Sequence, residues 1–124
     1  MCLIVKEGCK IETAKEDITT YKKVMIQDDF LWSGVFYGGR FRFNKLEKTV
    51  TNLSINECKN IEEGFHSFKR SRDNYIIFGK LVICIIPKGS EYCLGKSGDI
   101  VSNQIIVFRT FFDYIKYKLW KLFH

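Results

Sequence analysis

The sequence has few of the residues that mark secreted or metal-binding proteins, and no stretch suited to crossing a membrane. Its five cysteines are an odd number and form no C-x-x-C pair, so they predict reduced thiols rather than a disulfide framework. Its two histidines lack H-x-x-x-H spacing, and no metal-ligand set is visible. No apolar run approaches the roughly 20 residues that span a bilayer, and the first residues do not resemble a signal peptide. We therefore expect a cytoplasmic protein without metal, cofactor or transmembrane segment.

Proline is also scarce, since Pro87 is the only one. No low-complexity tract, repeat or proline-rich linker divides the chain, so residues 1–124 are expected to form a single domain. A chain of this size buries roughly two thirds of its unfolded surface. Apolar residues make up 46% of the sequence and aromatic residues 15%, which predicts a globular rather than a disordered protein.

Several short segments have the composition and alternation of β-strands. Residues 17–26 and 31–37 are rich in the β-branched and aromatic side chains that a pleated, half-buried surface favours. Gly38-Gly39 and the alternating RFRF sequence after it predict a hairpin between 31–37 and 40–46. The run KLVICII has no polar alternation, so it predicts a central strand buried on both faces. The expected strands are 17–26, 31–37, 40–46, 65–68, 80–86 and 100–108.

A short helix is expected in the middle of the chain. Ser54 and Glu57 have the spacing of a capping box, in which the hydroxyl and the carboxylate each accept a backbone N–H. The spacing predicts a helix over 55–62 that ends at Gly64.

The end of the chain predicts a longer, amphipathic helix over 110–123. Its apolar residues recur with the period of an α-helix and fall on one stripe. Strands followed by such a helix are typical of an α+β domain. We expect a mostly antiparallel, β-rich body over 1–109, with the stripe packed on its sheet. The stripe consists of Phe111, Phe112, Ile115, Leu119 and Leu122.

The same helix carries aromatic and basic residues away from this stripe, in a chain of net charge +6. Tyr114, Tyr117 and Trp120 lie among Lys118 and Lys121. A helix that is apolar on two sides fits best between its own sheet and a partner chain, which favours a homodimer. A nucleic acid or nucleotide, held by phosphate pairing and ring stacking, is the second alternative. An anionic membrane surface is the third.

A second basic group follows the predicted strands. Arginine forks suit phosphate or carboxylate, although such alternation on a strand is also typical of a solvated face. His66 lies among these residues, where a strand histidine with an ordinary hydrogen bond is the simpler interpretation. The candidate binding residues are Arg40, Arg42, His66, Lys69, Arg70, Arg72, Tyr114, Tyr117, Lys118, Trp120 and Lys121.

Most of the chain resembles small proteins of phages and mobile elements from gut and related bacteria. The resemblance is carried by the opening MCLIVKEG, by AKEDITTYKKV, by EGFHSF at 63–68 and by IIPKGSEY at 85–92. It implies an origin in a phage or mobile element and brings no activity with it.

The same central segments are also similar to the C-terminal half of ADP-ribosyltransferase toxins. In those proteins a Gly-aromatic-x-Ser-Thr-Ser strand precedes an I-P-K-G turn and a strand with a catalytic glutamate. The resemblance would put Ser67 at the first serine and Asp99 nearest the glutamate. Phe68 and Lys69 stand where threonine and serine belong, and no Glu-x-Glu or Gln-x-Glu precedes the final strand. That departure removes the main support for an oxocarbenium-like transition state.

Small size, positive charge, an aromatic-rich helix and no complete catalytic set together predict a non-catalytic binding protein. With the phage resemblance, we expect an inhibitor of host defence that acts in the host cytoplasm. Its partner would be a defence protein such as a nucleic-acid-guided nuclease, as for anti-CRISPR proteins, or a nucleotide signal that it sequesters. The alternatives are a diverged ADP-ribosyltransferase using Ser67, His66 and Asp99, and a small structural or assembly protein.

Overall fold

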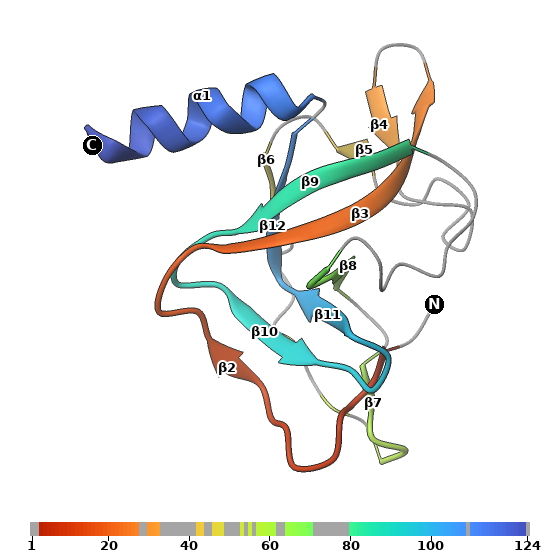
Figure 1. The fold of residues 1–124 in the computed structure, drawn as a ribbon. Helices are drawn as coiled ribbons and strands as arrows, with labels where there is room; N and C mark the ends of the chain where they lie inside the picture. Colours follow the sequence, from red (N-terminus) through yellow and green to blue (C-terminus); the bar gives the residue numbers. More distant parts are fainter. Residues whose placement is uncertain are drawn as a thin grey trace.

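The computed structural model describes residues 3–27, 30–32, 42–43, 46–48, 53, 55, 57–61, 64–70, 80–108 and 110–123. These residues form short strands followed by one helix, which confirms the α+β class (Figure 1). The elements are β1 (Leu3–Ile4), β2 (Glu12–Thr13), β3 (Ile18–Gln27), β4 (Phe30–Trp32), β5 (Arg42–Phe43), β6 (Leu46–Lys48), β7 (Asn60–Ile61), β8 (Phe65–Phe68), β9 (Lys80–Ile86), β10 (Glu91–Leu94), β11 (Asp99–Ser102), β12 (Gln104–Val107) and α1 (Phe111–Leu122).

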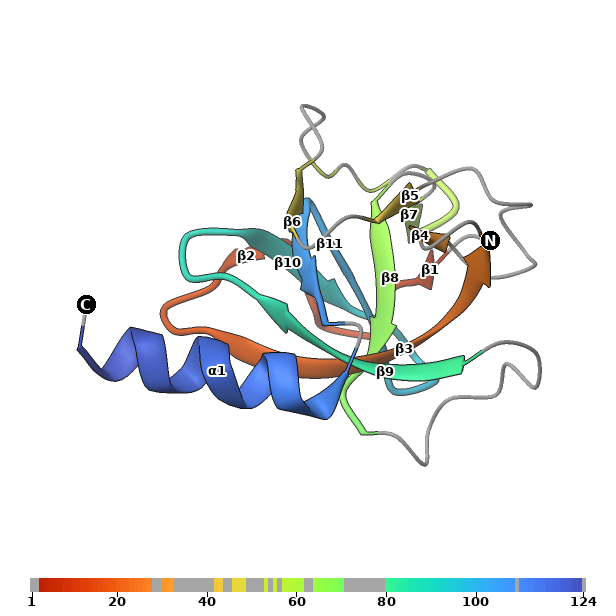
Figure 2. The same cartoon turned by 90° about the horizontal axis from the view of Figure 1, so that it is seen from above.

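One large antiparallel sheet makes up most of the molecule. Its strand order is β2-β10-β11-β8-β3-β9-β12-β6, and off this path β4 pairs with β3 and β5 pairs with β4. β1 and β7 form a separate two-stranded sheet. Figures 1 and 2 show the long β3–β9 pair between α1 on one side and β8, β10 and β11 on the other. The pair therefore separates the helix from the rest of the body.

The predicted central strand is confirmed as β9, which lies between β3 and β12. Its last three residues, 84–86, are fully buried, as expected for a strand covered on both faces. Leu81, near its start, is 42% exposed, so the prediction holds only for the second half. One core cluster gathers on this strand and its neighbours and consists of Phe65, Val82, Cys84, Ile105 and Val107.

A second core cluster lies under the small β1–β7 sheet. It consists of Val5, Leu53, Ile61, Cys93 and Val101. Gly64, at φ +144, comes just before β8 and approaches Val101 closely. The two clusters show that β8 and β11 carry buried side chains on both faces, as their fully buried patterns indicate.

The strands predicted over 17–26 and 65–68 are confirmed as β3 and β8. The single strand predicted over 100–108 is wrong, because two strands, β11 and β12, meet at Asn103. The Asn103 side chain accepts a hydrogen bond from the Glu91 backbone N–H (2.8 Å), and the Asn103 backbone N–H donates to the Glu91 carbonyl (3.1 Å). These bonds hold Asn103 outside the strand ladders of β11 and β12. The pairing partners change at this residue, because β11 pairs with β8 and β10, whereas β12 pairs with β9 and β6.

The predicted central helix is not confirmed by the described part of 55–62. Residues 57–59 form a turn, and the next two form β7, which pairs with β1. Lys59 has φ 61, a left-handed conformation that does not continue an α-helix. The pairing with β1 explains the difference, because the backbone N–H and C=O groups of β7 form hydrogen bonds with β1 and are not available for hydrogen bonds within a helix.

The predicted hairpin is confirmed where the structure describes it. β4 pairs with β5, with Trp32 opposite Arg42 and Leu31 opposite Phe43. The predicted second strand does not run on as one element to residue 46, because Leu46 belongs to β6 and pairs with β12. Gly38-Gly39 and the rest of 33–41 lie outside the described residues.

The helix predicted over 110–123 is confirmed as α1. Thr110 caps it, since its hydroxyl accepts a hydrogen bond from the Asp113 backbone N–H (3.1 Å). Asp113 in the first turn and Lys121 in the last also match the helix dipole. The side predicted to face the sheet is wrong, however, because Tyr114 and Tyr117 make the contacts with the body, whereas the residues of the apolar stripe are at least 37% exposed.

Candidate functional site

Two tyrosines hold α1 against the body. The Tyr114 hydroxyl lies 3.3 Å from the Thr19 hydroxyl, and the Tyr117 hydroxyl donates to the Asp17 carboxylate at 3.4 Å. Both rings also pack on Phe108, with ring centroids 5.6 and 5.4 Å away. Burial, and then the Asp17 carboxylate, raise the pKa of Tyr117 to about 12. The tyrosines expected to bind a partner therefore anchor the helix instead.

The opposite side of α1 is apolar and uncovered. We call it the outer face, and none of its side chains is buried. Leu119 is 53% exposed and Leu122 78%. Apolar side chains of this size normally leave water on folding, because each contributes about 1.5–3 kcal/mol when fully buried. The outer face consists of Phe111, Phe112, Ile115, Leu119, Leu122 and Phe123.

Lysines border this face on both sides. With about 3.6 residues per turn, Lys116 falls beside one edge of the stripe and Lys118 beside the other. The Lys116 ammonium lies 4.8 Å from the Phe112 ring centroid, and that of Lys118 lies 5.9 Å from the Tyr114 ring centroid. Lys121 lies nearer the tyrosine side, 5.9 Å from the Trp120 ring centroid. The same geometry turns Asp113, the helix's acidic residue, away from the outer face.

The second predicted basic group is only partly described. Lys69 and Arg70 follow β8 and are exposed, whereas His66 is buried at 3% exposure and does not join them on a surface. Arg42 is placed in β5 by its backbone. Arg40 and Arg72 lie outside the described residues.

His66 belongs to a buried polar centre that sequence reasoning recognised only in part. Its Nε2 lies 3.2 Å from Asp99 Oδ2, a close polar contact rather than an aligned hydrogen bond. Lys22 Nζ donates a hydrogen bond to the His66 backbone carbonyl at 2.6 Å. Nothing in YKKV distinguishes Lys22 from an exposed lysine, so the sequence carries no sign of this role. Asp99 is a candidate from the sequence only through the resemblance to ADP-ribosyltransferases.

Burial controls the protonation of this centre. It lowers the pKa of His66 more than Asp99 raises it, so the ring is neutral at neutral pH. Burial alone would raise the pKa of Asp99, but His66 and nearby backbone N–H groups lower it below its usual value. Burial also lowers the pKa of Lys22 to about 8. Each of the three residues is at most 5% exposed, so the centre is closed to solvent.

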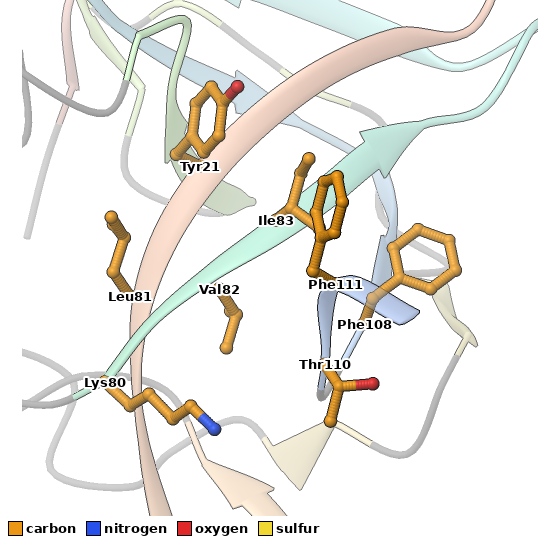
Figure 3. A pocket seen from close by; sticks show the side chains of 8 residues that line it. All are labelled: Tyr21, Lys80, Leu81, Val82, Ile83, Phe108, Thr110 and Phe111. Carbon is orange, nitrogen blue, oxygen red and sulfur yellow. The ribbon is translucent and has the colours of Figure 1, made fainter. Parts of the chain in front are cut away.

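A groove of about 370 Å³ lies between the start of α1 and the β3–β9 pair (Figure 3). Its lining is mainly apolar, Lys80 supplies a cation, and Phe111 belongs to both the groove and the outer face. His66, Ser67 and Asp99 do not line it. The lining residues are Tyr21, Lys80, Leu81, Val82, Ile83, Phe108, Thr110 and Phe111. A second hollow, of about 850 Å³, lies beside β2 and the start of β3.

The described residues contain neither a metal-ligand cluster nor a membrane-spanning helix. No group of three or more histidine, cysteine, aspartate or glutamate side chains in that part of the chain could hold a metal ion. None of the helices found there is both long enough and apolar enough to cross a membrane. No protein-family model, curated protein or solved structure matches the chain.

Replacing Tyr117 with phenylalanine tests how α1 is anchored. We expect Tyr117→Phe to lower the free energy of unfolding by about 0.5–1.5 kcal/mol, because it removes the hydrogen bond to Asp17. Amide hydrogen exchange within 111–122 should become faster. Tyr92→Phe is the matched control, since it removes a tyrosine hydrogen bond, to Glu12 of β2, that does not involve α1. Unchanged helix exchange in Tyr117→Phe would contradict this anchoring.

Proposed function

We propose that this is a non-catalytic binding protein that engages its partner through the outer face of α1. The observation that carries the proposal is a capped helix, anchored by two tyrosines, whose whole apolar side faces solvent. Contiguous exposed apolar patches typically mark interaction sites. The anchored tyrosine side presents the patch in a fixed orientation, which reduces the entropy that binding must overcome.

The buried polar centre supports binding over the enzymatic alternative. An ADP-ribosyltransferase must bring its dinucleotide to the residues that act on it. Ser67 is fully buried, Asp99 is 5% exposed and is held against His66, and neither hollow is lined by them. We therefore assign these residues to the stability of the core.

The kind of partner is narrowed by charge and resemblance. A net charge of +6 favours acidic partners, and the similarity to phage proteins favours a host-cell target. Inhibition of host defence is the role that this resemblance favours. A defence protein, its nucleic-acid or nucleotide ligand, and a lipid surface are the partners that the test below distinguishes. The outer face of α1 replaces the tyrosine side as the surface through which a homodimer would form.

The proposal is tested with two variants that remove equally exposed apolar side chains. Leu119 on the outer face and Ile4 in β1 are both 53% exposed. Purified wild type, Leu119→Ser and Ile4→Ser are mixed with bacterial lysate separated into membrane, nucleic-acid and soluble-protein fractions. We expect one fraction to retain the wild type and Ile4→Ser equally, and Leu119→Ser about tenfold less.

Two results would overturn the proposal. One is equal retention of all three proteins, or of none, in every fraction. The other is transfer of label from labelled NAD to lysate proteins that is lost in Asp99→Asn, since it would restore the enzymatic alternative.

A further inference from the structure

We propose that the partner of the outer face is the surface of an anionic lipid bilayer. Helix α1 would lie in the plane of the headgroups, with the outer face toward the acyl chains. This inference rests on the proposed function, because it names the partner of the same face.

The shape of the apolar surface fits a bilayer. At about 100° per residue, the six outer-face side chains cover roughly a third of the helix circumference along its whole length. A paired-helix seam consists of a narrow stripe with a 3-4-3 spacing, which residues 112, 115, 119 and 122 also have. Phe111 and Phe123 widen the exposed face beyond that stripe. Helices that lie in a bilayer interface instead carry a wide apolar side with phenylalanine and leucine, opposite a polar side rich in lysine. The outer face has that composition.

Charge also favours an anionic surface over a second copy of the chain. Lys116 and Lys118 border the face, and their long side chains can reach phosphate groups while their stems cover apolar surface. In a dimer through this face, the same lysines from both chains would meet at its edges, with no acidic residue of the face to pair them. Anionic headgroups would neutralise them.

The surroundings of the helix extend this surface. Trp120, 53% exposed, lies just beyond the stripe, where an amphipathic ring suits headgroup depth. At the other end, Phe111 continues the face into the groove that also contains Leu81 and Lys80 (Figure 3). Figures 1 and 2 both show the C-terminal end of α1 extending past the sheet.

The experiment is co-sedimentation of the full chain with vesicles of phosphatidylcholine alone or mixed with phosphatidylglycerol. We expect about tenfold stronger binding to the phosphatidylglycerol vesicles. Leu119→Ser should bind about tenfold more weakly, and Ile4→Ser should bind like the wild type. Tryptophan emission should shift to shorter wavelength with these vesicles, and Trp120→Phe should remove that shift.

A charge-matched pair of variants separates the lysine borders from net charge. Lys116→Gln with Lys118→Gln removes two charges beside the outer face. Lys15→Gln with Lys96→Gln removes two exposed charges elsewhere. At low salt only the first pair should lose binding, by about tenfold or more, since each lysine near the surface contributes about 1 kcal/mol.

Four outcomes would overturn the lipid assignment. If both double lysine variants lose vesicle binding equally, the vesicles attract the protein through its net charge alone. Absence of vesicle binding, with retention by soluble lysate that Leu119→Ser abolishes, would reject lipid and keep the binding function. Light scattering could also show a dimer that Leu119→Ser dissociates. If that dimer does not bind vesicles, the partner of the outer face is a second copy of the chain. Failure in both vesicles and lysate would reject the two proposals together.

Discussion

Gly64→Ala is expected to lower the free energy of unfolding by about 3 kcal/mol or more. Gly64 has φ +144, a conformation that residues with a side chain rarely adopt. A Cβ there would stand 2.5 Å from Cγ2 of Val101, 3.0 Å from Cδ2 of Leu53 and 3.2 Å from the Ser102 carbonyl oxygen. Backbone strain and overpacking would therefore act together at the junction between β8 and the second core cluster.

Chemical denaturation of the wild type and two alanine variants measures this effect. Gly8→Ala is the control, because Gly8 also has positive φ, +81, but no atom lies within 4 Å of its added Cβ. It should cost about 1 kcal/mol, from strain alone. Adding Val101→Ala should make the Gly64→Ala step less costly, since it removes the nearest atom. Similar costs for the two glycines would mean that the close approach at Gly64 is not present.

The elements with long, uniform patterns could be predicted from the sequence. The run KLVICII predicted β9, because seven consecutive residues without polar alternation fit a central strand. The helix α1 could be predicted because its apolar residues recur with the α-helical period over 12 residues. The strands β1, β2, β7 and β10 have two to four residues each, too few for a period to be recognised.

The side of α1 that meets the body could not be predicted in the same way. A hydrophobic stripe predicts the buried side only when apolar burial decides the packing. Here Tyr114 and Tyr117 find their partners Thr19 and Asp17, which are 95 and 100 residues away in sequence. Periodicity within the helix carries no information about such distant partners. The two tyrosines that were predicted to bind a partner therefore lie on the side of α1 that contacts the body.

The buried polar centre lies beyond local pattern reasoning for a related reason. Lys22 and His66 are 44 residues apart in sequence and meet only because β3 crosses β8, where Tyr21 pairs with Phe68. Lys22 lies in β3 opposite Val82 of β9, and its side chain is 5% exposed. A lysine next to another lysine in a strand reads as solvent-facing until the strand order is known. Because Lys22 is buried, the free energy of unfolding is expected to depend on pH in alkaline solution.

Lys22→Met is expected to remove a rise in stability that the wild type shows in alkaline solution. Burial lowers the pKa of Lys22 from 10.5 to about 8, and the attraction of Cys84 opposes this only weakly. Between these values the unfolded chain binds the proton and the folded protein does not, so the free energy of unfolding increases with pH. The full difference corresponds to about 3 kcal/mol. Below about pH 8 both states are charged, and the folded state carries the whole cost of the buried ammonium.

The window from about pH 7 to pH 9 isolates this group from Cys84. Burial raises the pKa of Cys84 from 9.0 to about 12, and a raised thiol pKa makes stability fall with pH only above 9.0. Wild-type stability relative to Lys22→Met should therefore increase by about 1 kcal/mol up to pH 9, and further up to 10.5. Lys23→Met removes the neighbouring lysine on the opposite face of β3 and should keep the rise. If wild type and Lys22→Met respond to pH identically, the Lys22 ammonium is hydrated in the folded protein, and the polar centre is open to water rather than part of a closed core.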